Sequence, residues 1–184
     1  MELKELFIMG ELNKVTRKLV KMNNRNHNYV LDKHFILKNL ALTYKKLKKF
    51  EISRYYLNLG LENIESEKLI SPVEYYDLQW LNIELNKDTL NDKQMLEIYE
   101  DMYKYYKKID HKRNEYCLLC NIYRLKKEYD NMEELLYEVC NLDFKNIDDA
   151  IKEILQDFKL LGDTYYAQAL KIVNKSYRNN FMML

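Results

Sequence analysis

The sequence has few of the residues that break helices and form turns, with three glycines and one proline in 184 residues. Strands joined by tight turns need these residues at defined positions, so their scarcity excludes most β-rich folds. No apolar run approaches the roughly 18 residues of a membrane span. The opening MELKELFIMGELNK carries acids where a secretory signal would be basic and then apolar. We therefore expect an all-α protein in the cytoplasm, with no membrane segment.

Motifs for common catalytic chemistry are also missing. Gly10, Gly60 and Gly162 are too far apart to form a phosphate-binding loop. The three histidines are scattered, and there is no HExxH pattern. Adjacent acids such as Asp148 and Asp149 are typical of the first turn of a helix, where negative charge complements the helix dipole. We expect no enzymatic activity and no cofactor.

The three cysteines include one pair with a metal-like spacing, because Cys117 and Cys120 form a CLLC motif and Cys140 could be a third ligand. A zinc site needs four ligands, or three and an open position, and its ligands usually lie on turns. The CLLC motif instead falls among leucines in a predicted helix. We expect buried structural thiols and no metal.

Charge is distributed unevenly along the chain, although the net charge is only +1. Residues 1–50 hold 12 Lys and Arg against 4 Asp and Glu, a balance of +8, and the remaining residues balance at −7. A basic region of this kind can bind nucleic acid or an acidic partner, and opposite charges at the two ends can drive self-association. Nucleic-acid binding through the basic N-terminal region, and self-assembly as a structural protein or a homodimer, are therefore alternatives to the function expected below.

Apolar residues recur at steps of three and four through most of the chain, which predicts amphipathic helices. The polar run NNRNHN separates a first helix from the rest, so residues 1–28 should form an N-terminal helix and a linker. We expect a single domain, residues 1–184, with about four antiparallel hairpins and a tail at 178–184. The predicted helices are at about 2–22, 32–48, 51–64, 72–85, 95–106, 113–127, 130–140, 147–161 and 164–177.

Two stretches, NLALTYKKLKKFEISRYYLNLGL and CNIYRLKKEYDNMEELLYEVC, share one pattern of large and small residues. Their tyrosines, Tyr44 and Tyr123, lie 79 positions apart, and each is followed six residues later by a second aromatic, Phe50 or Tyr129. This pattern resembles the tetratricopeptide repeat, a helix-turn-helix of about 34 residues. The resemblance covers residues 34–177 and implies a right-handed superhelix of stacked hairpins.

In the tetratricopeptide repeat family, the first helix of each hairpin lines a concave groove that binds peptides. The groove positions implied here carry amides, which can pair with a peptide backbone, and cations, which select a carboxylate. The resemblance therefore implies a site for a peptide or protein segment with acidic groups or a free C-terminus. The implied groove residues are Lys38, Asn39, Lys45 and Lys46 in the first repeat, Asn114, Asn121 and Arg124 in the third, and Lys152, Gln156 and Lys159 in the fourth.

The Lys, Asn and Tyr-rich composition also resembles the repeat regions of Rap-type and arbitrium-type receptors, the peptide-responsive regulators of quorum sensing in low-GC Gram-positive bacteria and their phages. The transcriptional members of that group place a DNA-binding domain before the repeats. Only about 33 residues precede the repeats here, so we do not expect sequence-specific DNA binding. We expect a non-enzymatic peptide- or protein-binding module that regulates another protein.

Overall fold

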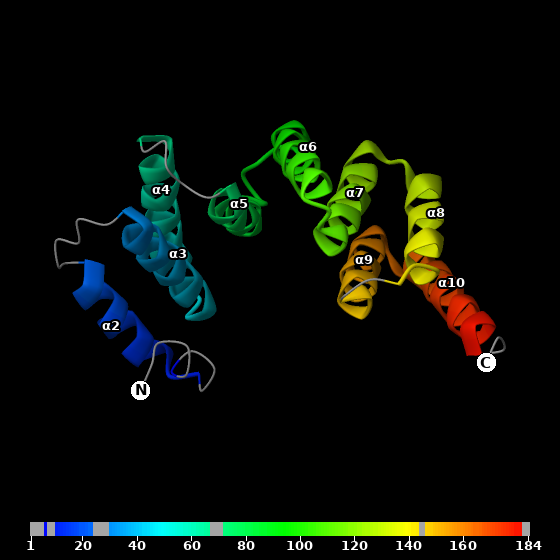
Figure 1. Cartoon of the computed structure of the whole chain (residues 1–184), viewed down its shortest axis with the longest axis horizontal. Helices are drawn as coiled ribbons and strands as arrows, with labels where there is room; N and C mark the ends of the chain where they lie inside the picture. The colour runs from blue at the N-terminus through cyan, green and yellow to red at the C-terminus, as the bar shows by residue number, and fades with distance from the viewer. Residues whose placement is uncertain (1–5, 7–9, 24–29, 67–71, 144–145, 182–184) are drawn as a thin grey trace. The chain divides into compact units, whose positions relative to one another are not determined.

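The computed structural model describes residues 6, 10–23, 30–66, 72–143 and 146–181. Within these residues every regular element is a helix (Figure 1), which confirms the all-α prediction for this part of the chain. None of the helices in these ranges combines the length and the apolar character needed to cross a bilayer. The nine described helices are α2 (Leu12–Asn23), α3 (Val30–Lys46), α4 (Phe50–Ser66), α5 (Pro72–Asn86), α6 (Asp92–Lys108), α7 (Lys112–Lys126), α8 (Tyr129–Cys140), α9 (Ile147–Leu161) and α10 (Asp163–Phe181).

The chain forms two compact units, unit 1 at Met1–Asn91 and unit 2 at Asp92–Leu184. The boundary falls between α5 and α6. The sequence predicts that α5 and α6 pair as a hairpin, that the chain is a single domain, and that its hairpins form a superhelix. These three stay predictions.

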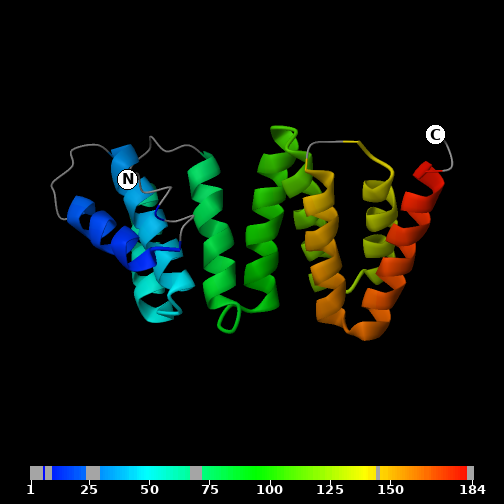
Figure 2. The same ribbon diagram turned by 90° about the horizontal axis from the view of Figure 1, so that it is seen from below.

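In unit 1, α2 packs on α3, α3 packs on α4, and α5 packs on both α3 and α4. Figures 1 and 2 show α3 and α4 as a close antiparallel pair. Leu19, Ile36 and Leu40 are buried between α2 and α3. Leu57 and Leu78 belong to a second cluster where α3, α4 and α5 meet. Unit 1 therefore has a core on two sides of α3.

Small residues allow α4 to approach its neighbours closely. A Cβ atom on Gly60 would lie 3.2 Å from Leu78 Cδ1 of α5, which is tighter than ordinary van der Waals contact. Ser53 is buried, and its hydroxyl donates a 2.7 Å hydrogen bond to the Ala41 carbonyl of α3. Larger side chains at these two positions would push the helices apart.

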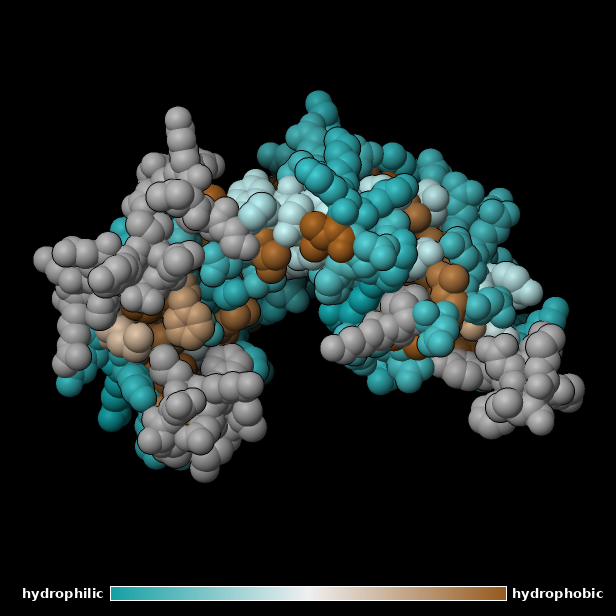
Figure 3. All heavy atoms as spheres, in the orientation of Figure 1, coloured by the Kyte–Doolittle hydropathy of each residue, from teal (hydrophilic) through white to brown (hydrophobic). Residues whose placement is uncertain are grey.

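In unit 2, α6 packs on α7, α7 packs on α8 and α9, and α10 packs on α8 and α9. Hydrophilic atoms cover most of the visible face over α6 in Figure 3. The core is centred on Met132, Leu136 and Phe158, each fully buried. Cys120 and Cys140 belong to this core, and Cys117 is buried between α7 and α9 with its Sγ 4.0 Å from the Ala150 carbonyl, so all three thiols are buried as the sequence predicts.

Both ends of the chain differ from the predicted helix bounds. The predicted helix at 2–22 is interrupted, because Gly10 adopts φ +73° and the Glu11 N–H donates to the Leu6 carbonyl at 2.9 Å. This geometry is that of a left-handed helix cap, which glycine favours. Residues 1–5 and 7–9 lie outside the described residues. At the other end, α10 continues to Phe181, so part of the predicted tail is helical.

Candidate functional site

Ion pairs join α3 and α5 of unit 1 along one side of each helix. Lys38 Nζ lies 2.7 Å from Asp77 Oδ2, and Lys45 pairs with Glu84. Both pairs connect residues 39 positions apart, so the two helices run in the same direction. Seven residues separate the two lysines, which places them two turns apart on one side of α3. We call these two helices the α3/α5 surface.

A stripe on α3 lies beside the ion pairs. Phe35, Asn39, Leu42 and Lys46 follow one another at steps of four, three and four, so they share one side of the helix. Phe35 is 47% exposed, Lys46 is exposed, and the other two are half-buried. The Asn39 amide donates a 2.7 Å hydrogen bond to the Phe35 carbonyl. This stripe places an exposed aromatic ring and a partly accessible amide beside the ion pairs.

A chain of side-chain hydrogen bonds runs along another side of α5. The Gln79 amide donates to the Tyr75 hydroxyl at 2.9 Å, the Asn82 amide to Gln79 at 3.1 Å, and the Asn86 amide to Asn82 at 2.8 Å. Arg54 of α4 completes the chain by donating to the Asn86 side chain at 3.0 Å. These polar groups bind one another and join α4 to the end of α5. We assign them a structural role.

Unit 2 repeats the arrangement of parallel helices joined by charged groups, here α7 and α9. Arg113, near the start of α7, pairs with Glu153 in the middle of α9. Further along, Asp157 accepts hydrogen bonds from Asn121 Nδ2 at 3.0 Å and from Arg124 Nε at 3.2 Å. Arg124 also donates to the Asn121 side-chain oxygen at 2.9 Å. We call these two helices the α7/α9 surface.

Asp157 is the most deeply buried acid in this network, with 8% of its surface exposed. Burial raises the pKa of Asp157 to about 6, and the neighbouring Arg124 guanidinium opposes this rise. Near neutral pH the carboxylate is therefore mostly ionised and depends on Arg124 for compensation. The positive charge of Arg124 is therefore already paired with Asp157 inside the protein.

Accessible groups also border the ion pairs of unit 2. Asn114, Asn121 and Leu125 of α7 share one side of that helix and are half-buried. The Asn121 amide is already bonded to the Cys117 carbonyl, Asp157 and Arg124, so Asn114 is the amide of this group that a ligand could contact. On α9, Gln156 is exposed and Leu160 is 72% exposed. The combination of amides with an exposed leucine matches the chemistry of the stripe on α3.

The remaining groove residues of the sequence prediction lie elsewhere on α9. Lys152 lies 3.6 Å from Asp149 of its own helix. Lys159 lies over the ring of Tyr166 in α10, 5.8 Å from the ring centroid. Lys152 and Lys159 are seven residues apart and share a side of α9 that is nearly opposite Asp157. The structure therefore does not bring these two lysines together with Arg124.

The sequence prediction missed the acids that pair with the cations of α3 and α7, and Arg113, the partner of Glu153, was not among its groove residues. A signal was present, because each acid follows its cation by 33 to 40 residues, about one repeat length. In unit 1 the two acids also keep the seven-residue spacing of the two lysines. The missed acids are Asp77, Glu84, Glu153 and Asp157.

Each unit thus presents two parallel helices joined by charged side chains, with an accessible stripe of amide and apolar groups beside them. The chain matches no family model, no curated protein and no solved structure. Among the described residues, no group of three or more His, Cys, Asp or Glu side chains could hold a metal ion.

Proposed function

We propose that this chain is a non-enzymatic binding module that holds a peptide or protein segment on its α3/α5 surface or on its α7/α9 surface and thereby regulates a partner. The observation that carries the proposal is the same in both units: charge pairs fix two parallel helices, and an exposed apolar side chain and partly accessible amides lie beside them. A surface fixed before binding loses little conformational entropy when a ligand arrives, which favours recognition.

The ion pairs change which ligand chemistry the surfaces favour. Selection for an acidic segment would depend on the positive charges of Lys38, Lys45 and Arg124, and a carboxylate already faces each of them. We therefore propose a segment that is held mainly by apolar anchors at Phe35 or Leu160 and by amide contacts to its backbone. Both anchors are accessible, at 47% and 72% exposure.

Peptides selected from a random display library against the full chain provide the test. Phe35→Gln and Leu160→Gln remove the proposed anchors, and each should weaken the peptides that its surface binds by about ten-fold or more, as at interface hot spots. Tyr55→Gln on α4 and Tyr137→Gln on α8 are the matched controls, because these tyrosines are 59% and 53% exposed on other helices. The controls should leave affinity unchanged.

Two results would count against the proposal. Equal affinity in all four variants would exclude both surfaces, and a loss confined to the two tyrosine variants would move the site to α4 and α8. Charge reversal at Arg124 is not a suitable test, because a glutamate there would face the buried Asp157 and destabilise the fold.

Nucleic-acid binding is the second candidate, and one observation about α2 favours it. Lys14, Arg17, Lys18 and Lys21 share one side of the helix and are exposed, while the opposite side is buried against α3. Because the apolar side is already covered, the helix has no apolar face to insert into a lipid surface. Phosphates of a nucleic acid are the matching partner.

Salt dependence tests this second candidate. Four phosphate contacts predict that log K falls with log salt with a slope of about −3 for a single strand. The double variant Arg17→Gln/Lys18→Gln should reduce the magnitude of that slope by about 1.5. Lys104→Gln/Lys108→Gln on α6 removes the same charge from another helix and should leave the slope unchanged. Affinity that does not respond to salt would eliminate the candidate.

A further inference from the structure

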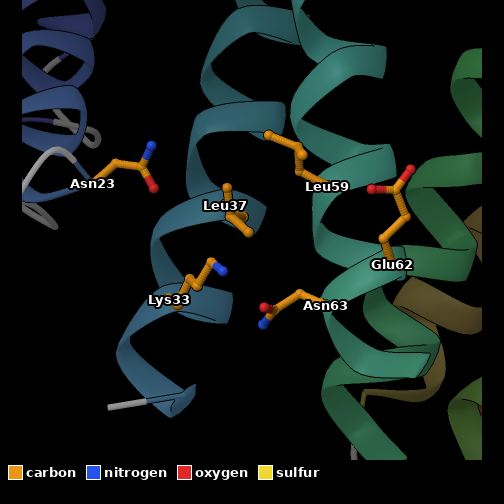
Figure 4. Close-up of a pocket in the computed structure, with 6 residues that line it drawn as sticks. All are labelled: Asn23, Lys33, Leu37, Leu59, Glu62 and Asn63. Atoms are coloured by element: carbon orange, nitrogen blue, oxygen red, sulfur yellow. The ribbon is translucent and has the colours of Figure 1, made fainter. Parts of the chain in front are cut away.

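Unit 1 contains a pocket of about 400 Å³ where α2, α3 and α4 meet (Figure 4). Its volume lies in the range of small-molecule sites, roughly 300–1,000 Å³. The pocket is distinct from the α3/α5 surface, because Lys33 and Leu37 lie on nearly the opposite side of α3 from Phe35 and Asn39. The lining residues are Asn23, Lys33, Leu37, Leu59, Glu62 and Asn63.

Opposite charges occupy two sides of this pocket. Lys33 comes from the start of α3, and Figure 4 shows its ammonium group pointing toward α4. Glu62 comes from α4, and both side chains are exposed. Within the described ranges neither side chain has an ion-pair or hydrogen-bond partner, whereas Lys38 and Lys45 of the same helix are both paired. The pocket therefore holds one positive and one negative group that are not used by the fold.

The wall between the two charges is partly polar and partly aliphatic. Asn63 is 8% exposed, and its Nδ2 lies 3.1 Å from Nε2 of His34, which is 2% exposed. This contact fixes the orientation of the Asn63 carboxamide at the pocket. Leu59 points from α4 toward α3, where Leu37 lies (Figure 4). The two leucines provide an apolar surface of limited size.

We infer that this pocket binds a small zwitterion with an aliphatic side chain, the chemistry of an aliphatic α-amino acid. Lys33 would pair with the carboxylate, Glu62 with the ammonium group, and Leu37 and Leu59 would contact the side chain. A phosphate or a simple carboxylate would meet repulsion from Glu62, and a simple amine would meet repulsion from Lys33. The inference does not depend on the proposed peptide-binding surfaces.

Calorimetric titration of the full chain with leucine tests the inference. We expect saturable binding with a Kd of ~1 mM or tighter. Three probes each lack one feature: 4-methylpentanoate lacks the ammonium group, 3-methylbutylamine lacks the carboxylate, and glycine lacks the side chain. Each should bind at least about five-fold more weakly than leucine, since one charged or apolar contact near the surface is lost.

Variants then locate the binding site. Lys33→Gln and Glu62→Gln should each weaken leucine binding about five-fold, and Glu62→Gln should remove the preference for leucine over 4-methylpentanoate. Lys49→Gln, an exposed lysine outside the pocket, is the control and should have no effect. Far-UV circular dichroism checks that each variant keeps its helical content.

Three outcomes would overturn the inference: no saturation by leucine up to ~10 mM, equal binding of leucine and all three probes, or equal effects of the pocket variants and the control. Because Phe35→Gln and Leu160→Gln leave this pocket intact, their effects on peptide binding are measured independently. Failure of one proposal is therefore distinguishable from failure of the other.

Discussion

Replacing Arg124 with methionine removes the charge that faces the buried Asp157 and keeps a side chain of similar length. Burial raises the pKa of Asp157 to about 6 even with the guanidinium present. Without Arg124, the pKa of Asp157 should rise further, because the positive charge and the hydrogen bond of the guanidinium, which both oppose the effect of burial, are lost. The folded protein must then either hold an uncompensated carboxylate or bind a proton.

The sign and size of the effect follow from this pKa. A pKa of about 6, raised from 3.8, means that ionising Asp157 costs the folded state about 3 kcal/mol relative to the unfolded chain. This contribution to stability is fully present below pH ~4 and is lost as pH rises through ~6. In Arg124→Met the pKa of Asp157 is higher, so stability goes on falling to a higher pH than in the wild type. We expect the variant to be less stable by about 1 kcal/mol at pH 5, and by about 3 kcal/mol at pH 8.

Urea unfolding followed by circular dichroism measures both values, with wild type and variant compared at each pH so that other titrating groups cancel. Asp157→Asn supplies the control background, because asparagine does not titrate. In that background, Arg124→Met should cost the same at pH 5 and pH 8. An equal loss at both pH values in the protein with Asp157 intact would refute the reasoning, since the effect would then be one of packing alone.

Two further predictions concern packing. Gly60→Ala should change stability little, because a helix-propensity gain of about 1 kcal/mol is offset by the 3.2 Å contact with Leu78 Cδ1. Gly60→Val should destabilise the protein by about 1–3 kcal/mol in the same urea assay. A valine that stabilises the protein would contradict the close approach of α4 and α5. Burial raises the pKa values of Cys117 and Cys120, and that of Cys140 to about 11. A thiol-specific disulfide reagent should therefore react with the native protein at least about 100-fold more slowly than with the protein in guanidinium, and rapid native labelling of Cys120 would show that the core of unit 2 is open.

Helix positions were predictable where a residue with special backbone geometry marks the boundary. Pro72 begins α5, and Gly162, with φ +115°, ends α9 at the predicted residue. Gly10 carried the same kind of signal, but the apolar spacing on both sides of it suggested one continuous helix. A single glycine in a helical pattern can lie inside a continuous helix or can end the helix, and the local sequence does not decide between the two.

The partners of the cations were harder to predict than the helices. Whether Lys38 meets Asp77 depends on the distance and angle between α3 and α5, and packing sets these quantities. The raised pKa of Asp157 has the same origin, since position 157 is polar in a stripe that packing against α7 buries. Helical periodicity gives the side of a helix that a residue occupies; it does not give the residue that faces it.

This limitation matters for function, because a count of positive residues overstates the charge available to a ligand. In residues 1–50 the balance is +8, yet Lys38 and Lys45 face acids from α5, which lies outside that range. The basic residues Lys14, Arg17, Lys18 and Lys21 of α2 are exposed and share one side of the helix. An electrostatic partner should therefore bind at α2, and a peptide held by apolar anchors should bind at the paired helices. Peptide affinity should then change little with salt while nucleic-acid affinity falls steeply, so one salt titration for each ligand separates the two proposed functions.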